Sequence, residues 1–486
     1  MGTDSVSEEG SSPEMVERPV AERTMVDGLT DLLLDSFPTQ RSSHRQMGLR
    51  AQFPIAGLDG KAGDTGMLWP FLKGDGFEEY REPNGMLSAL HGEKFSYSVT
   101  AGRGVMEIQI PLQNSLFEMQ DRLYEAVARL IPAAERWKKH VLAYGGLPST
   151  PATPECLTHK FHYFSLLRAI QEPYLYRGLQ ATNRFWINTD RRNILDEMNW
   201  FHLLSPLFAM WSANTPIFAG EDGYYPSSRW QHQSKLDVGD GRWQIVHTPY
   251  SGMDEWVFHT LHQPHLLLRD AEGWLNPGEG LFGVHSHGKL PIECWDAYQD
   301  HLETMWTMTH PVLHTDASLP SNVQGVSGLQ VAETEQGSIE ETMAMAALLL
   351  GCSEEAESLM KWLEDLVPDP PEKREWGLRP EDILQRNLDY HKDVWAAFFR
   401  HWNRFLKQGV IHPEPFFGCV DGIFSFARRG LEARGLGEEV LLNPLEYRIR
   451  QQMDWSSEIR RQWLLHGNDG LIHAVKLSLR PESDTL

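Results

Sequence analysis

Apolar side chains recur with two different spacings in the first third of the chain. Residues 22–36 carry them at intervals of three or four, which predicts a helix. Residues 48–55 are typical of a strand, and residues 96–112 alternate around a Gly-rich centre, which predicts two strands joined by a tight hairpin. A long helix is predicted over residues 115–143.

The remainder of the chain mixes loops with helical patterns. A Gly- and Pro-rich loop over 145–157 precedes a predicted strand at 183–190. Helices are predicted over 198–213, 338–351, 353–366 and 381–409, and Gly351 is expected at the end of the second. Strands and helices interleave without regular βαβ units. An α+β core with an antiparallel sheet and a helical C-terminal part therefore fits best.

Composition narrows the class of partner. The chain has 44 Lys and Arg against 67 Asp and Glu, a formal net charge of −23. Such a surface repels nucleic-acid phosphates and anionic lipids, so we expect no nucleic-acid and no membrane partner. Because no run of about 18 apolar residues is present, we expect no membrane-spanning helix. The four cysteines form no Cys-x-x-Cys pair, which favours reduced thiols in a cytoplasmic protein.

The stretch SANTPIFAGEDGYYPSSRW, residues 212–230, places Arg229 at the end of a loop punctuated by Gly and Pro. An Arg in this position is often a structural clamp on backbone carbonyls. Its planar set of donors also suits the binding of a carboxylate or phosphate, so a role in a binding site is the second interpretation.

The same stretch resembles the glutamate–cysteine ligase family, in its bacterial and plant carboxylate–amine ligase branch. That family has a helix ending in Ala-Asn-Ser-Pro-Phe, then Gly, a short loop and Ser-x-Arg. Here the order is Ala213-Asn214-Thr215-Pro216-Ile217, Gly220, Gly223 and Ser227-Ser228-Arg229. Further blocks resemble the family in the same order, and the resemblance covers roughly residues 45 to 410. These blocks lie at residues 143–164, 186–190, 256–269, 295–306 and 329–351.

The resemblance implies a glutamine-synthetase-like antiparallel sheet that curves around a funnel, with helices packed behind it. It also implies that ATP phosphorylates the γ-carboxylate of glutamate before an amine attacks, a reaction that needs Mg²⁺ held by carboxylates. The expected substrate is small and amino-acid-like. The expected domains are an acidic disordered tail over residues 1–21, a ligase-like catalytic domain over 22–410 and a helical extension over 411–486. The oligomeric state is left open.

The sequence departs from the family where metal ligands are expected. Arg50 and Gln52 stand where the family has Gly-x-Glu-x-Glu, and Gln330 replaces another Glu. Gln offers only a neutral carbonyl, and Arg50 would repel Mg²⁺ but could pair with Glu107, the one carboxylate kept in the second strand pair. These changes leave the use of ATP and Mg²⁺ open. The chain is either an altered carboxylate–amine ligase, or a pseudo-ligase that binds an amino-acid-like ligand or a protein partner without turning over ATP.

The resemblance gives each candidate site residue a role. Arg229 would hold an anionic group, and Glu107 would hold a metal or orient an Arg. Substrate contacts are expected from Asn188, Asp190, Arg50, Arg103 and His301.

A group of histidines offers a different kind of site. His259, His262 and His265 are spaced three apart, and His285 and His287 follow. Imidazoles suit Zn²⁺ or Fe²⁺ better than Mg²⁺, so this group is a candidate replacement metal site. Pro264 would break a helix there, however, and core or surface positions are the other interpretation for these residues.

Overall fold

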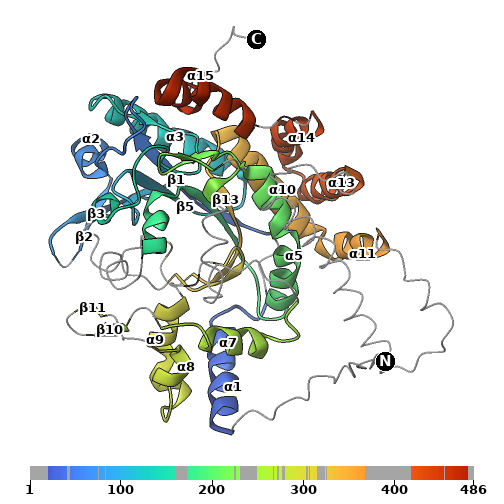
Figure 1. Cartoon of the computed structure of the whole chain (residues 1–486). Helices are drawn as coiled ribbons and strands as arrows, with labels where there is room; N and C mark the ends of the chain where they lie inside the picture. The colour runs from blue at the N-terminus through green and yellow to red at the C-terminus, as the bar shows by residue number, and fades with distance from the viewer. Residues whose placement is uncertain are drawn as a thin grey trace, which may run out of the picture.

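A computed structural model describes most of the chain, and Figure 1 shows its course. The described residues are 20–40, 44–74, 76–82, 84–158, 172–223, 226–229, 249–265, 268–270, 273–275, 280–302, 305, 307–314, 323, 326–366, 417–451, 453 and 455–479.

Within these residues, nine strands form one open sheet in the order β12-β13-β7-β1-β5-β4-β3-β2, with β6 paired to β1. Every neighbouring pair runs antiparallel. The strands are β1 (Met47–Ala56), β2 (Glu78–Arg81), β3 (Leu87–His91), β4 (Ser96–Val99), β5 (Val105–Gln113), β6 (His140–Val141), β7 (Thr182–Ile187), β12 (His310–Val312) and β13 (Gly328–Glu335). Two small ribbons lie apart from it: β8 (Ile217–Phe218) with β9 (Glu221–Asp222), and β10 (Leu268–Asp270) with β11 (Gly273–Leu275).

Helices occupy much of the remaining described chain. They are α1 (Val20–Asp35), α2 (Trp69–Leu72), α3 (Leu116–Glu135), α5 (Ile194–Ser212), α7 (Met253–Leu261), α8 (Phe282–His285), α9 (Pro291–Leu302), α10 (Ile339–Glu354), α11 (Ala356–Leu366), α13 (Phe417–Arg434), α14 (Asn443–Arg450) and α15 (Trp455–Val475). None of these helices combines the length and apolar character needed to cross a membrane.

The period-two alternation of the strands gives the sheet two different faces. Leu49, Ala51 and Phe53 of β1 are fully buried and belong to the main hydrophobic core. Helices α3, α5 and α10 pack on the sheet and supply the other side of this core (Figure 1). The intervening positions of β1, Arg50 and Gln52, point to the opposite face. The sheet therefore has an apolar face covered by helices and a face rich in polar side chains.

The helix over 338–351 does not end at its glycine. Helix α10 continues to Glu354, and Gly351 lies inside it against α13. A Cβ at Gly351 would lie 2.2 Å from the carbonyl oxygen of Ala427, and one at Gly430 would lie 2.0 Å from that of Gly351. These glycines let two helix backbones touch, which is a packing role rather than a capping role.

Most predicted elements within the described residues are confirmed, but several of their ends differ, since α10 runs on to Glu354 and β7 already ends at Ile187. The predicted helix over 115–143 is too long, because α3 ends at Glu135 and β6 follows at His140. Lys138 adopts a positive φ of 54° between them, which no α-helix accommodates. The predicted helix at 381–409, the boundary between residues 410 and 411 and most of the tail over 1–21 lie outside the described residues, so the division into domains stays a prediction.

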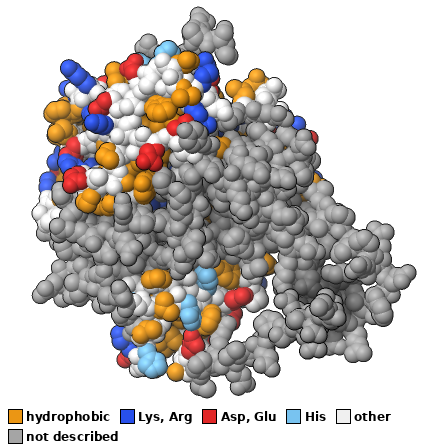
Figure 2. Space-filling view, viewed as in Figure 1, with side chains coloured by type: hydrophobic (Ala, Val, Ile, Leu, Met, Phe, Trp, Pro, Cys, Tyr) orange, Lys and Arg blue, Asp and Glu red, His pale blue; other side chains and the backbone are white. Residues whose placement is uncertain are grey.

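The mixed α+β class with an open antiparallel sheet is confirmed, while the funnel curvature stays a prediction. On the face drawn in Figure 2, acidic and basic side chains are intermixed on the described surface.

Candidate anion-binding site

A row of charged side chains crosses the polar face of the sheet. Arg50 of β1 lies opposite Arg184 of β7, and Arg184 lies opposite Glu333 of β13. On the other side, Arg50 lies opposite Gln109 of β5. Residues that face each other across strands have adjacent side chains, so the registers alone bring two guanidinium groups and one carboxylate together.

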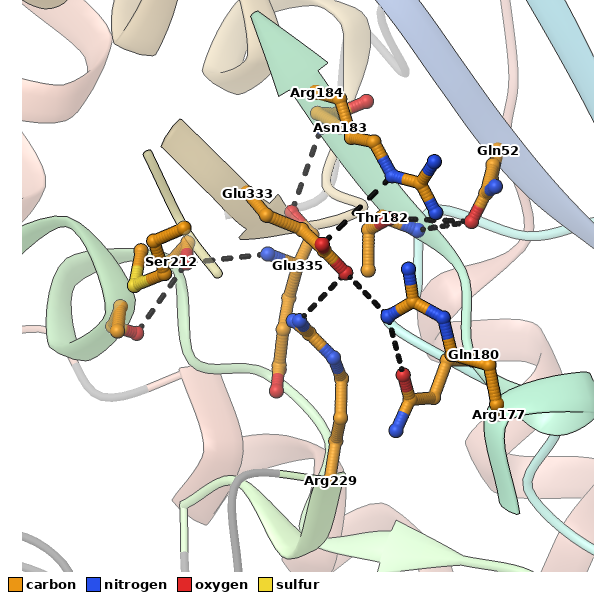
Figure 3. Close-up of polar contacts among 12 residues, drawn as sticks. Gln52, Arg177, Gln180, Thr182, Asn183, Arg184, Ser212, Arg229, Glu333 and Glu335 are labelled. Carbon is orange, nitrogen blue, oxygen red and sulfur yellow. Dashed lines mark hydrogen bonds and ion pairs between the residues drawn. The ribbon is translucent and has the colours of Figure 1, made fainter. Parts of the chain in front are cut away.

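Three guanidinium groups converge on the carboxylate of Glu333 (Figure 3). Arg177 Nη1 lies 2.8 Å from Glu333 Oε1, Arg229 Nη2 lies 3.0 Å from the same oxygen, and Arg184 Nε lies 3.7 Å from Oε2. Each comes from a different segment: Arg184 from β7, Arg177 from the 3₁₀ turn before it and Arg229 from the helical residues 228–229 that follow β9. Glu333 is therefore the shared anion of a buried cluster.

This cluster sets the ionisation of Glu333. Burial raises the pKa of that carboxyl, but the charges of Arg177, Arg184 and Arg229 outweigh it and hold the pKa well below its usual range. Burial also lowers the pKa of Arg177 to about 10, which leaves it charged at neutral pH. The cluster is thus a set of ion pairs, and Glu333 is ionised throughout the physiological range.

Arg229 is fully buried, at 0% exposure, and the loop that carries it is fixed to β13. Thr215 Oγ1 donates to Glu335 Oε1 at 2.8 Å, Ser227 Oγ donates to the same oxygen, and the Asn214 N–H donates to Oε2 at 2.6 Å. Burial raises the pKa of Glu335 despite the nearby Arg229 charge. Because Arg229 pairs with Glu333, it contacts a side-chain carboxylate of the polar face and is more than a clamp on backbone carbonyls. Its role toward a ligand stays a prediction.

Glu107 lies beside the arginines but is held by amides. Gln52 Nε2 donates to Glu107 Oε2 at 2.9 Å, and Gln109 Nε2 donates to Oε1 at 2.8 Å. Burial raises the pKa of Glu107. The charges of Arg50 and Arg184 and these two hydrogen bonds lower that pKa by more than burial raises it, so the carboxyl group is ionised. The hydrogen-bonding partner described for Arg50 is His314, with Nη2 3.4 Å from Nδ1. Among the described residues, Arg50 thus acts on Glu107 as a nearby charge, and no direct contact is described for the expected pair.

A small pocket of about 40 Å³ opens onto this cluster, which is room for a few water molecules or a very small ligand. Its lining combines guanidinium groups, neutral polar groups and apolar side chains. The lining residues are Arg50, Arg177, Arg184, Gln299, Leu302, Met305, His310, Pro311, Val312, Leu313, Gln330 and Glu333. Burial lowers the pKa of His310 to about 4, so its ring is neutral at pH 7. Among the described lining residues, three guanidinium groups therefore accompany one ionised carboxylate.

The carboxylates of this face do not fit the Mg²⁺ site that ATP-dependent ligation needs. Glu107 accepts from two amides, Glu333 is shared by three guanidinium groups and Glu335 accepts from the Arg229 loop. Mg²⁺ requires carboxylate oxygens arranged around one point, and cations beside that point oppose it. Within the described ranges, no three His, Cys, Asp or Glu side chains gather as a metal site.

Four predicted site residues lie away from the pocket lining. Arg103 sits in the β4–β5 hairpin and pairs with Asp64 at 2.7 Å. Asn188 Oδ1 accepts from the Gln46 N–H, and Asp190 Oδ1 accepts from the N–H groups of residues 192 and 193 just before α5. His301 is buried in α9, with Nε2 2.9 Å from the Thr260 carbonyl. Their substrate roles stay predictions, and the contacts seen here are those of turns, caps and packing.

The histidines of the candidate metal site lie in different environments. His262 is exposed and lies 3.3 Å from Glu22, whereas His265 is buried against Phe282. His259 Nε2 lies 3.3 Å from Gln263 Nε2. The described members of this group do not converge on one point.

Sequence reasoning did not single out Arg177, Arg184 or Glu333. The sequence did contain a signal for Arg184. A charged residue inside the apolar strand 183–187 indicates that one face of the sheet is polar and functional. Arg177 lies in a turn with no periodic pattern. Glu333 sits three positions after Gln330, an odd spacing that predicts opposite faces of a regular strand.

No family model matches the sequence, and no curated protein matches it. Among solved structures, the chain is similar to glutamate–cysteine ligase from Francisella tularensis in complex with AMP. The TM-score is 0.47 and the identity 10%, over 90% of this chain and 88% of that one. It is also similar to a bifunctional glutathione synthetase from Pasteurella multocida, with a TM-score of 0.42 and 9% identity, over 92% of this chain and 51% of that one. Because both TM-scores are below 0.5, these likenesses carry no inference about activity.

Proposed function

We propose that this chain binds a small carboxylate-bearing molecule in the pocket beside Glu333, without using ATP and Mg²⁺. The observation that carries this proposal is the excess of guanidinium groups on the pocket wall. Arg50, Arg177 and Arg184 line it, and Glu333 is also paired with the fully buried Arg229.

The energetics favour a ligand that supplies negative charge. A cation removed from water is costly unless an anion compensates it, and planar guanidinium groups bind carboxylates with two parallel hydrogen bonds. A carboxylate beside these side chains would add a counter-charge to the cationic lining of the pocket.

The competing function is the ATP-dependent joining of a carboxylate to an amine, as the family resemblance implies. That reaction needs a metal to neutralise the transferring phosphoryl group. Here the neighbouring charges are Arg50 and Arg184, and Glu107 is occupied by Gln52 and Gln109. This geometry supports binding without turnover, which was the alternative open at the sequence level.

The test is a thermal denaturation series on the purified full chain. Millimolar carboxylates, amino acids and ATP·Mg²⁺ are added separately. A ligand present at 100 times its Kd stabilises the folded state by about 2.7 kcal/mol, which is easily measured. We expect stabilisation by carboxylates and none by ATP·Mg²⁺.

Arg50→Gln should remove the stabilisation by carboxylates, whereas the matched control Arg81→Gln should retain it. Arg81 is an exposed arginine of β2 that pairs with Glu79 and does not line the pocket. Release of ADP that depends on an amino acid and an amine would refute the proposal in favour of the ligase.

A further inference from the structure

A second cavity lies where the C-terminal helices meet the start of α10 (Figure 1). Its volume is about 460 Å³, within the range of about 300–1,000 Å³ that is usual for small-molecule sites. Helices α10, α14 and α15 line it, together with the segment that follows α15. It shares no described lining residue with the pocket beside Glu333, so it is a separate candidate site.

Apolar side chains make up more than half of the described lining of this cavity. Tyr447, Met453 and Trp455 are 63%, 42% and 41% exposed, which is high for large apolar residues, and all three line it. Ile459 and Val475 also line it and belong to a buried hydrophobic cluster. A ligand that covers the exposed rings would remove apolar surface from water, which is favourable. The lining therefore favours a ligand with an aromatic or otherwise apolar body.

Three of the five charged side chains in the described lining are already held in ion pairs. Arg448 Nη1 lies 2.8 Å from Glu341 Oε1, so these two lining residues neutralise each other. Glu458 Oε1 lies 2.6 Å from Arg461 Nη2, one turn further along α15. These pairs bring little net charge to a ligand in the cavity.

The other two charged lining residues are Lys476 and Glu340. Burial and the charge of Lys476 lower the pKa of His140 of β6, which does not line the cavity, so the Lys476 charge lies toward β6. Glu340 is exposed and accepts a hydrogen bond from the Tyr124 hydroxyl. Burial and Glu340 raise the pKa of Tyr124, which keeps this donor neutral. Among the described residues, the Glu340 carboxylate therefore has no cationic partner.

The start of α10 does not favour an anion in this cavity. Ser338 Oγ accepts from the Glu341 N–H, and Glu341 Oε2 accepts from the Ser338 N–H, which forms a capping box. Glu340 and Glu341 also place two carboxylates in the first turn, where they would repel an anionic ligand. The charges at this end of the cavity thus favour a cation.

We propose that this cavity binds a small organic monocation, an ammonium group carried on an aromatic or apolar body. The ammonium group lies at Glu340, and the body packs against Tyr447, Met453 and Trp455. The faces of the Tyr and Trp rings add attraction for a cation. This site is separate from the proposed carboxylate pocket, and either can fail without the other.

The test is calorimetric titration of the full chain at pH 7 with four matched probes. Tryptamine carries the ammonium group and the ring, tryptophol replaces the ammonium group by a neutral hydroxyl, and indole-3-propionate replaces it by a carboxylate. Ethylamine keeps the ammonium group but lacks the ring. We expect tryptamine to bind at least about tenfold more tightly than each of the others, because a hydrogen bond to a charged group contributes about 1.5–3 kcal/mol.

Variants assign the two parts of the site. Glu340→Gln should bring the affinity for tryptamine down to that for tryptophol and leave tryptophol binding unchanged, a loss of preference that a general structural defect would not produce. Glu357→Gln is the matched control, because Glu357 is also an exposed glutamate in the first turn of a helix, α11, and does not line the cavity.

Trp455→Ala should weaken tryptamine and tryptophol alike, by about fivefold or more. Its control is Trp137→Ala, since Trp137 is 46% exposed and lies outside the cavity lining. Circular dichroism reports whether each variant folds, and the titrations of the unaltered chain test the proposal even if a variant does not fold.

The outcomes decide both the site and the charge of its ligand. Binding of tryptophol or indole-3-propionate as tight as that of tryptamine would overturn the assignment of a cation. No binding of any indole probe would overturn the site itself. A preference for tryptamine that survives Glu340→Gln would also overturn the proposal. None of these results depends on whether carboxylates bind beside Glu333.

Discussion

Replacing Glu333 by Gln tests whether this carboxylate is the shared counter-ion of the arginine cluster. Glu333 is 2% exposed, and three guanidinium nitrogens lie 2.8, 3.0 and 3.7 Å from its oxygens. Breaking a buried ion pair by removing one partner costs about 3–5 kcal/mol, because the other charge stays buried without compensation. Gln keeps the shape but not the charge. We therefore expect Glu333→Gln to lower the free energy of unfolding by about 3–5 kcal/mol.

Arg229→Met should cost less, because Glu333 keeps Arg177 and Arg184 as partners. We expect about 1–3 kcal/mol, the range for a lost hydrogen bond to a charged group. The ranking of the two variants is thus a consequence of three cations sharing one anion. If Glu333 and Arg229 formed an isolated ion pair, Glu333→Gln and Arg229→Met would lower the free energy of unfolding by the same amount.

The assay is urea unfolding followed by tryptophan fluorescence and circular dichroism at pH 7. Glu125→Gln is the matched control, because Glu125 also pairs with two cations, Lys94 at 2.9 Å and Arg129 at 3.0 Å, but is 36% exposed. Exposed pairs contribute about 0–1 kcal/mol, so the control should stay within that range. A loss for Glu333→Gln no larger than that of the control would refute the reasoning.

Three further predictions concern other parts of the molecule. Burial lowers the pKa of His202 to about 3, so between about pH 6.5 and 3 the unfolded state takes up a proton that the folded state does not, and stability falls as the pH falls through that window. His202→Phe should therefore remove about 2 kcal/mol of the stability loss between pH 6.5 and 5, measured by urea unfolding at both pH values, whereas the exposed His287→Gln should remove none of it. Gly351→Ala should destabilise by about 1–3 kcal/mol, because the new methyl group would overlap the Ala427 carbonyl, while a Cβ at Gly74 would make only an ordinary contact, 3.8 Å from Arg129 Nη1, so Gly74→Ala should change the urea midpoint little. Arg103→Gln should leave carboxylate affinity unchanged in calorimetry, since Arg103 is 42% exposed in the hairpin; a tenfold loss would instead support its predicted contact with substrate.

Four of the nine strands of the described sheet, β1, β4, β5 and β7, were predictable because they follow the alternation that burial of one face imposes. The pattern in residues 48–55 and 96–112 identified β1, β4 and β5. Strand order and register were not predictable, because they depend on contacts between distant segments. The register places Gln52, rather than Arg50, opposite Glu107. The residue that faces Glu107 is therefore the next one along the same face of β1, and not the expected Arg50.

The centre of the site escaped prediction for a local reason. The register of β13 shifts between Gln330 and Ala332, which marks a bulge. A bulge adds one residue and reverses the alternation, so Gln330 and Glu333 line the same pocket despite their odd spacing. Arg177 and Arg229 reach the cluster from turns, where no periodicity reports the direction of a side chain.

The predicted helix over 115–143 illustrates the limit at element ends. Its apolar spacing is genuine, and eight of its side chains are buried between Leu116 and Ala134. The end is set instead by the turn at Lys138 and by pairing of β6 with β1. Such an end depends on a strand pairing that the helical pattern does not contain.

The central claim is that the pocket binds a carboxylate and does not use ATP and Mg²⁺. The most direct measurement is a pair of calorimetric titrations of one preparation of the full chain, with acetate and with ATP·Mg²⁺. We predict saturable heat with acetate, lost in Arg50→Gln, and no saturable heat with ATP·Mg²⁺. Saturable binding of ATP·Mg²⁺ that is abolished when the metal is chelated would contradict the account and restore the ligase reaction as the function to test.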